Sequence, residues 1–180
     1  MNNLQKNYFD LFELPIKLPL DRDKLALCYQ QLQRQYHPDN FATSEESARL
    51  AMLQYSADIN QAYQILDNPL SSAQYLLALN GIDIDPEKNI INDHAFLIQQ
   101  FELREQLDII ANLRDLPEKE QQLTEFTSTI KNIWQESYTL LLSAIARSDW
   151  SLATSQINTL RFLEKLQQDI DILEEKLFDF

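Results

Sequence analysis

Apolar residues recur at steps of three and four along most of this chain, the spacing that places them on one face of an α-helix. In the N-terminal part, prolines and polar capping residues interrupt this pattern. The interruptions predict four helices, over residues 8–14, 21–36, 44–67 and 71–79. We expect Asp21 to cap the second helix and Thr43 or Ser44 to cap the third. The chain's only glycine, Gly81, stands where the fourth helix needs a residue with left-handed backbone.

Three longer helical patterns follow residue 92. They are expected to begin at Asp93, at Pro117 and at Ser148 or Asp149, and proline suits the first turn of a helix. The last pattern carries an apolar stripe typical of the seam of a helical bundle, formed by Leu160, Leu163, Leu166, Ile170, Leu173 and Leu177. Because the connections between these patterns are short, neighbouring helices should be antiparallel and form a three-helix bundle.

The composition supports an all-α fold. Strands and hairpins need glycine-rich turns, but this chain of 180 residues has one glycine and six prolines. Hydrophobic residues make up 44% of it, which is enough for a core. The stretch over residues 82–92 contains several helix breakers and is the predicted connection between two domains. The expected organisation is a helical domain over residues 1–81 and a bundle over residues 93–180.

The formal net charge of −13 argues against nucleic acid or an anionic membrane as a partner, because both require a basic surface. Residues 1–80 carry 6 Lys/Arg and 9 Asp/Glu (net −3), and residues 81–180 carry 9 and 19 (net −10), which predicts two surfaces with different partners. The sequence shows no leader pattern and no apolar run of membrane-spanning length, so we expect a cytoplasmic protein. The single cysteine, Cys28, excludes an internal disulfide and is expected to be a small core residue.

The tripeptide His37-Pro38-Asp39 follows the second predicted helix and is the strongest local signal in the chain. Proline has no amide hydrogen and pushes the preceding residue toward extended backbone, so the helix must end at Tyr36. His37 and Asp39 should then project from a rigid turn into solvent. As a catalytic pair they lack a nucleophile, and a chain with one glycine has no phosphate-binding loop. The other histidine, His94, is distant in sequence, so we expect no enzyme activity, no metal site and no cofactor.

Several segments together match a known pattern: Asp10-Leu11-Phe12, Gln33-Arg34-Gln35-Tyr36, the His-Pro-Asp turn, Asn60-Gln61-Ala62-Tyr63-Gln64-Ile65-Leu66, Pro69, Glu102-Leu103-Arg104-Glu105 and Leu160-Arg161-Phe162-Leu163. The N-terminal segments resemble a J-domain, and the whole chain resembles the HscB-type co-chaperones of iron–sulfur cluster assembly. The resemblance implies a protein that brings an iron–sulfur cluster scaffold (IscU-like) to a dedicated DnaK-type chaperone (HscA-like) and stimulates the chaperone's ATPase. The chain lacks the paired-cysteine, zinc-binding extension of eukaryotic relatives, which indicates the bacterial type.

The same resemblance implies that the chaperone contacts His37, Pro38 and Asp39. Asn40 replaces the lysine that is common after this tripeptide, and the second helix has few basic residues. Docking should therefore depend on the cations of that helix, which are Arg22, Lys24 and Arg34.

A helical wheel from residue 94 separates two apolar faces. One is a core stripe formed by Phe96, Leu103, Leu107 and Ile110. The other consists of Leu97, Ile98, Phe101, Glu102 and Glu105. This second face either packs against the third bundle helix or the J-domain, or it binds a partner. The resemblance favours a partner, the scaffold, and adds Phe162, which is expected beside the apolar seam of the last helix. Ile109 stands where an acid is expected at the edge of this face.

Two other functions stay open on these observations. A J-domain adaptor of the same build would deliver a different client. A purely structural helical module would carry the His-Pro-Asp turn by accident. A chaperone ATPase assay separates the structural module from the other two, and a scaffold pull-down separates those two from each other.

Overall fold

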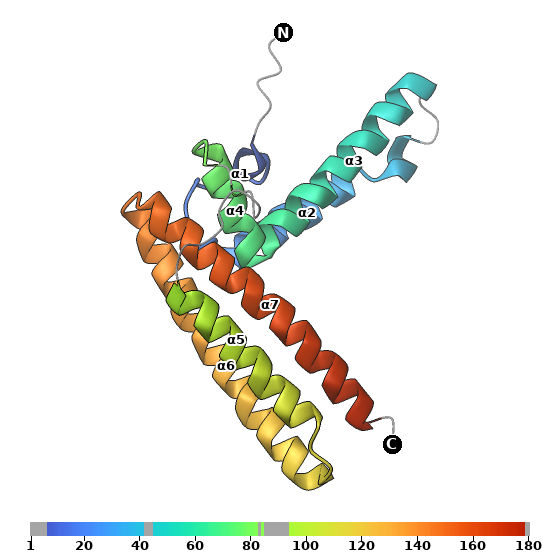
Figure 1. Ribbon diagram of the computed structural model, residues 1–180. Coiled ribbons are helices and arrows are strands. Elements are labelled where there is room, and N and C mark those ends of the chain that lie inside the picture. Colours follow the sequence, from blue (N-terminus) through green and yellow to red (C-terminus); the bar gives the residue numbers. More distant parts are fainter. Residues whose placement is uncertain (1–6, 42–44, 83, 85–93, 179–180) are drawn as a thin grey trace. The chain divides into compact units, whose positions relative to one another are not determined.

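The computed structural model describes residues 7–41, 45–82, 84 and 94–178. The chain divides into two compact units, Met1–Ile82 and Asp83–Phe180. Within the described residues every regular element is a helix, so the all-α prediction is confirmed (Figure 1). None of these helices is both long and apolar enough to cross a bilayer.

The first unit is built around a hairpin of two long helices. Its elements are α1 (Tyr8–Leu11), α2 (Arg22–Gln35), the short 3-10 helix η1 (Pro38–Phe41), α3 (Glu46–Asp67) and α4 (Pro69–Leu79). Helices α2 and α3 lie side by side, and η1 follows α2 at the end of the hairpin away from α4 (Figure 1).

Aromatic side chains join the two helices of the hairpin. The Tyr29 ring stacks on that of Tyr63 with centroids 3.9 Å apart, and the Tyr29 hydroxyl donates to Asn60 Oδ1 at 3.0 Å. Nearer to η1, the rings of Tyr36 and Tyr55 meet edge to face at 4.6 Å. Such ring pairs contribute about 0.5–1.5 kcal/mol beyond their burial. The hairpin is thus held together along its length, up to the residue that precedes the turn.

Of the caps predicted for the two hairpin helices, only that of α2 lies in the described part of the chain. Asp21 caps α2 as expected, because its Oδ1 accepts from the backbone N–H of Lys24 at 2.9 Å. Thr43 and Ser44 lie outside the described residues. Helix α3 begins at Glu46, and the preceding Glu45 makes no side-chain capping bond.

Helix α4 begins two residues earlier than predicted, at Pro69. The Asn68 side chain accepts from the backbone N–H of Ser71 at 2.8 Å, and proline is well tolerated in the first turn. At the other end Gly81 has φ +76°, which confirms its predicted left-handed backbone. The amides of Gly81 and Ile82 donate back to the carbonyls of Ala78 and Leu77, which completes a Schellman C-cap.

The second unit contains α5 (His94–Ala111), α6 (Leu116–Ala146) and α7 (Trp150–Phe178), which pack against one another as the predicted three-helix bundle (Figure 1). Asp115 caps α6 and places Pro117 in its first turn. Asp149 accepts from the backbone N–H of Leu152 at 3.1 Å and so caps α7, whereas Ser148 takes a left-handed backbone with φ +55°. Asp93 lies outside the described residues.

The bundle core contains the predicted stripes of α5 and α7. It is made of Leu103, Leu107, Ile110, Leu123, Phe126, Ile130, Phe162, Leu163, Leu166 and Ile170, with Phe96, Leu173 and Leu177 partly buried against it. Leu160 is buried as well. The positions of the apolar residues along these two helices therefore predicted the core correctly, apart from Phe162.

Cys28 is less buried than the sequence analysis predicted. It is only half-buried on α2, where Leu25 is fully buried. A hairpin of two helices covers one side of each helix, so a residue at the margin of the apolar stripe keeps contact with solvent. The prediction that Cys28 belongs to the core is therefore wrong.

Candidate functional site

The first candidate site is the turn between α2 and α3. Helix α2 ends where Pro38 requires it to end: the Tyr36 amide makes the last helical bond, to the Leu32 carbonyl at 2.9 Å, and η1 begins at Pro38. The side chains of His37 and Asp39 are 58% and 89% exposed. The expectation that both project from the turn into solvent is confirmed.

The His37 imidazole is oriented by Asp39. Its Nδ1 lies 3.3 Å from the backbone N of Asp39 and 3.5 Å from Asp39 Oδ2. A neutral imidazole accepts a hydrogen bond from that N–H, and a protonated one donates to the carboxylate. The Asp39 side chain is 89% exposed, so most of its carboxylate is free for an external cation.

The cations of α2 differ in what their side chains do. Arg22 and Arg34 are exposed, and Arg34 lines a hollow of about 520 Å³ beside His37, together with Gln30, Gln33, Asn40 and Ser56. The ammonium of Lys24 instead donates to the backbone carbonyl of Glu13 at 2.9 Å. Lys24 therefore ties the loop after α1 to α2, which is a structural role that its place in the sequence did not reveal.

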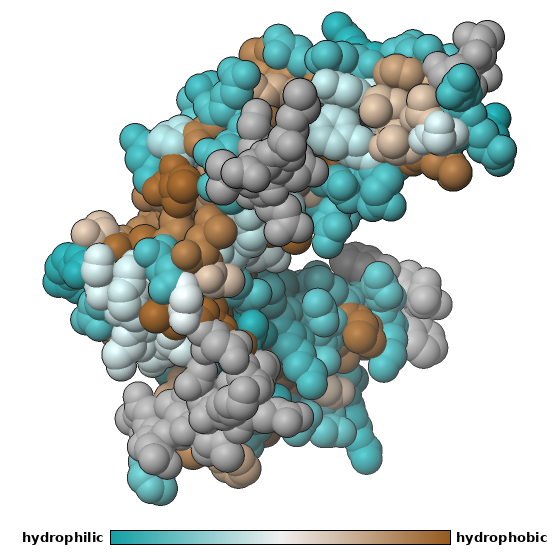
Figure 2. Space-filling view, turned by 90° about the horizontal axis from the view of Figure 1, so that it is seen from above, coloured by the Kyte–Doolittle hydropathy of each residue, from teal (hydrophilic) through white to brown (hydrophobic). Residues whose placement is uncertain are grey.

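The second candidate site is one face of α5. Leu97, Ile98 and Phe101 are 48%, 57% and 67% exposed, and Glu102 and Glu105 beside them are exposed too. Ile109, farther along the helix, is also exposed. The alternative in which the third bundle helix covers this face is therefore wrong. Figure 2 shows one side of the molecule, on which apolar patches interrupt a largely hydrophilic surface.

Phe162 does not lie on the surface beside these residues. It is 8% exposed and belongs to the bundle core, where its ring meets that of Phe96 edge to face at 6.3 Å. The guanidinium of Arg104 lies 5.4 Å from the ring centroid, close enough for a cation–π contact. The expectation that Phe162 stands beside the seam of α7 is wrong, because two side chains of α5 cover it.

Comparison with known proteins identifies the fold and the family. Residues 92–171 match the family model of the HSCB C-terminal oligomerisation domain. The structure of the chaperone HscB from Vibrio cholerae is 39% identical, with 95% of this chain and 99% of that chain covered and a TM-score of 0.88. This chain belongs to the HscB family of co-chaperones. The human co-chaperone protein HscB is 29% identical at a TM-score of 0.87, with 96% of this chain and 84% of that chain covered. The Jac1 co-chaperone from Saccharomyces cerevisiae, 19% identical at a TM-score of 0.72 with 92% and 94% covered, has the same fold.

The family assignment gives both units a name. The first unit of this member of the HscB family is a J-domain, and the second is the helical bundle of the family. The chain is accordingly a J-protein co-chaperone of iron–sulfur cluster assembly. The two candidate sites therefore belong to different domains of one co-chaperone.

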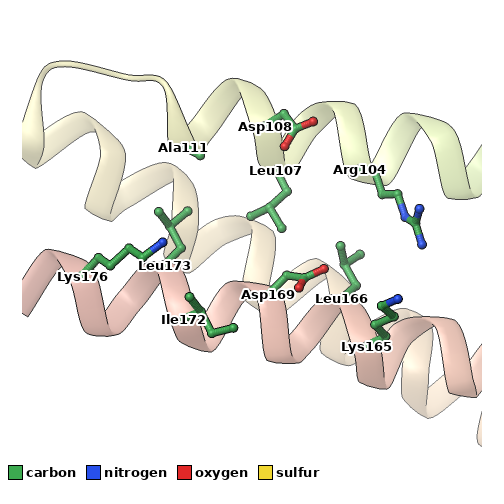
Figure 3. Close-up of a pocket in the computed structure, with 10 residues that line it drawn as sticks. All are labelled: Arg104, Leu107, Asp108, Ala111, Lys165, Leu166, Asp169, Ile172, Leu173 and Lys176. Carbon is green, nitrogen blue, oxygen red and sulfur yellow. The ribbon is translucent and has the colours of Figure 1, made fainter.

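A groove between α5 and α7 is a further hollow of the bundle, with a volume of about 410 Å³. Its floor is apolar, and Figure 3 shows Arg104 and Lys165 near one end, Lys176 at the other, and Asp108 and Asp169 between them. Three cations and two carboxylates alternate along it, so no continuous stretch of the groove carries charge of one sign. Among the described residues no cluster of His, Cys, Asp or Glu has a geometry that could hold a metal ion.

Proposed function

We propose that this chain stimulates the ATPase of a dedicated DnaK-type (HscA-like) chaperone and delivers an iron–sulfur cluster scaffold protein (IscU-like) to it. The observation that carries this proposal is the presence of two chemically different exposed surfaces, one on each domain. A polar turn with an exposed His/Asp pair stands at the tip of the J-domain. An uncovered apolar face with a carboxylate rim lies on α5 of the bundle.

The J-domain turn supplies the chaperone contact. The Asp39 carboxylate, 89% exposed, pairs with an arginine of the chaperone, and His37, whose Nδ1 lies 3.5 Å from Asp39 Oδ2, orients it. Pro38 completes the tripeptide that contacts the chaperone. Arg34 and Arg22 meet acidic surface on the chaperone, where exposed charges act mainly on the rate of association. Lys24 contributes less than these two, because its ammonium already donates to the Glu13 carbonyl. No bond is made or broken by this chain itself, since ATP hydrolysis takes place in the chaperone.

The face of α5 supplies the scaffold contact. Leu97, Ile98 and Phe101 form its apolar centre, and Glu102 and Glu105 form the rim. A large aromatic residue that is two-thirds exposed on a rigid helix is the kind of side chain that anchors an interface. Phe162 acts from below: it fills the core beneath this end of α5 and holds Arg104 over its ring. The iron–sulfur cluster itself is bound by the scaffold protein.

The test measures both activities with the same preparation. The chaperone's ATPase rate is followed against the concentration of this chain, with and without the scaffold protein, and the mixture is run on a size-exclusion column. We expect a rate that rises to saturation, and co-elution of the chain with the scaffold. Absence of any stimulation would leave the chain as a structural helical module. Stimulation without co-elution would identify it as a J-domain adaptor for a different client.

A further inference from the structure

Like any helix, α2 ends with backbone carbonyls that lack their usual helical donors, and two of them concern the His-Pro-Asp turn directly. The carbonyl of Arg34 would normally accept from the amide four residues later, but that residue is Pro38, which has no N–H. The carbonyl of Gln35 would accept from the Asp39 amide, which points at His37 Nδ1 instead. The His-Pro-Asp turn therefore leaves the carbonyls of Arg34 and Gln35, in the last turn of α2, without backbone donors.

Asn40 closes this gap with its side chain. Its Nδ2 donates to the Arg34 carbonyl at 2.8 Å and to the Gln35 carbonyl at 3.4 Å. Its backbone amide donates to the His37 carbonyl at 3.0 Å. One residue thus joins η1 to the end of α2 from both sides of the turn. The two hydrogens of a primary amide suit this task, because each can serve one carbonyl.

We propose that Asn40 is a positioning residue for chaperone stimulation, which holds the His37–Asp39 turn against the end of α2 by direct hydrogen bonds. Its effect on stimulation rests on the proposed function, whereas its effect on the turn does not. Lysine, which the family resemblance leads one to expect here, would present a flexible four-carbon stem with a point charge. Asparagine has a shorter side chain and loses less conformational freedom when it makes these bonds.

Two variants remove the donor in different ways. Asn40→Ala deletes the amide, and Asn40→Asp keeps its shape but replaces the donor nitrogen with an oxygen that the two carbonyls repel. Gln64→Ala is the matched control, because it removes an exposed amide from α3 at a position away from the turn. The first readout is the NMR order parameter of the backbone amides of Tyr36, His37, Asp39, Asn40 and Phe41 in the free protein. We expect values typical of rigid backbone, about 0.85, in the wild type, and values below about 0.6 at His37, Asp39 and Asn40 in both Asn40 variants.

The second readout is the chaperone's ATPase rate against the concentration of this chain. Both Asn40 variants should need several-fold more protein for half-maximal stimulation, reach the wild-type maximum and keep the wild-type melting temperature. Unchanged order parameters would overturn the proposal whatever the ATPase shows. Lower order parameters with unchanged half-saturation would overturn the positioning role. A wild-type protein that fails to stimulate would count against the proposed function alone, because the order parameters are measured without the chaperone.

Discussion

The two candidate surfaces of this chain are held in place in opposite ways. The turn of the J-domain is polar, and its shape depends on a few hydrogen bonds that His37, Asp39 and Asn40 make with one another and with the Arg34 carbonyl at the end of α2. The face of α5 is apolar, and its shape depends on the core residues on the opposite side of the same helix. A site of the first kind can be disabled without loss of stability, because none of its members belongs to the core. A site of the second kind stays in place as long as the bundle is folded.

The largest expected effect is at the turn. His37→Gln should abolish stimulation of the chaperone's ATPase while scaffold binding, the helical signal and the melting temperature stay at wild-type values. Exposed positions away from core features usually change stability by within about 0.5 kcal/mol. ATPase rates and thermal melts of the variant and of Gln64→Ala provide the check. A marked drop in melting temperature would show that His37 supports the fold, and the contrast between the two surfaces would then fail.

The second prediction compares alanine substitutions at two phenylalanines of the bundle, one exposed and one buried. Phe101→Ala should weaken scaffold binding by about 2 kcal/mol or more, some thirtyfold, at unchanged stability and unchanged chaperone stimulation. Phe162→Ala should instead cost about 3–5 kcal/mol of unfolding free energy, because it empties part of the core. Urea unfolding measures the stability of both variants, and binding titrations measure their affinity for the scaffold. An unstable Phe101→Ala protein would place that residue in the core and remove it from the client surface.

A third, smaller effect concerns salt. Association with the chaperone should slow as ionic strength rises, since the Debye length falls from about 10 Å at 0.1 M to about 3 Å at 1 M. Arg34→Gln should reproduce part of this loss at low salt, and Lys131→Gln on the exposed surface of α6 serves as its control. Stopped-flow or surface-based association rates are the measurement. A rate independent of salt would mean that the cations of α2 do not steer the encounter.

The smallest expected effect is a pH dependence in the bundle. Partial burial raises the pKa of the Glu164 carboxyl on α7 above its ordinary value of 4.5. The folded protein then holds that proton more tightly than the unfolded chain, so stability is lost as pH rises through the raised pKa. Glu164→Gln should therefore melt slightly above the wild type at neutral pH, and this advantage should vanish below pH 4.5. Glu175→Gln, at an exposed position of the same helix, is the control. If Glu164→Gln raised the melting temperature equally at neutral and at acidic pH, the raised pKa of Glu164 would not be the cause.

Hydrophobic spacing and capping residues predicted much of this molecule. The steps of three and four gave the bundle stripes, and Pro38 and Gly81 marked helix ends where the structure has them. Phe162 was misplaced because a helical wheel describes one helix alone, and its ring is covered by Phe96 and Arg104 of another.

The roles of Lys24 and Asn40 escaped the sequence analysis for a related reason. Each side chain donates to a backbone carbonyl, of Glu13 in one case and of Arg34 in the other. Every residue has a carbonyl, so no residue type marks the acceptor in a sequence. A signal was present at Asn40, since a proline four residues after Arg34 leaves that carbonyl in need of a donor. For Lys24 we find no comparable signal.

The left-handed backbone of Gly81 suits a residue of D configuration. A Cβ added there would meet no atom within 4 Å, so the surroundings leave room for a side chain, and the only obstacle is the backbone at φ +76°. An L-residue is strained in that region, but its mirror image prefers it. D-alanine introduced at this position by chemical ligation should therefore fit without strain, and it should stabilise the J-domain because it restricts the unfolded chain more than glycine does.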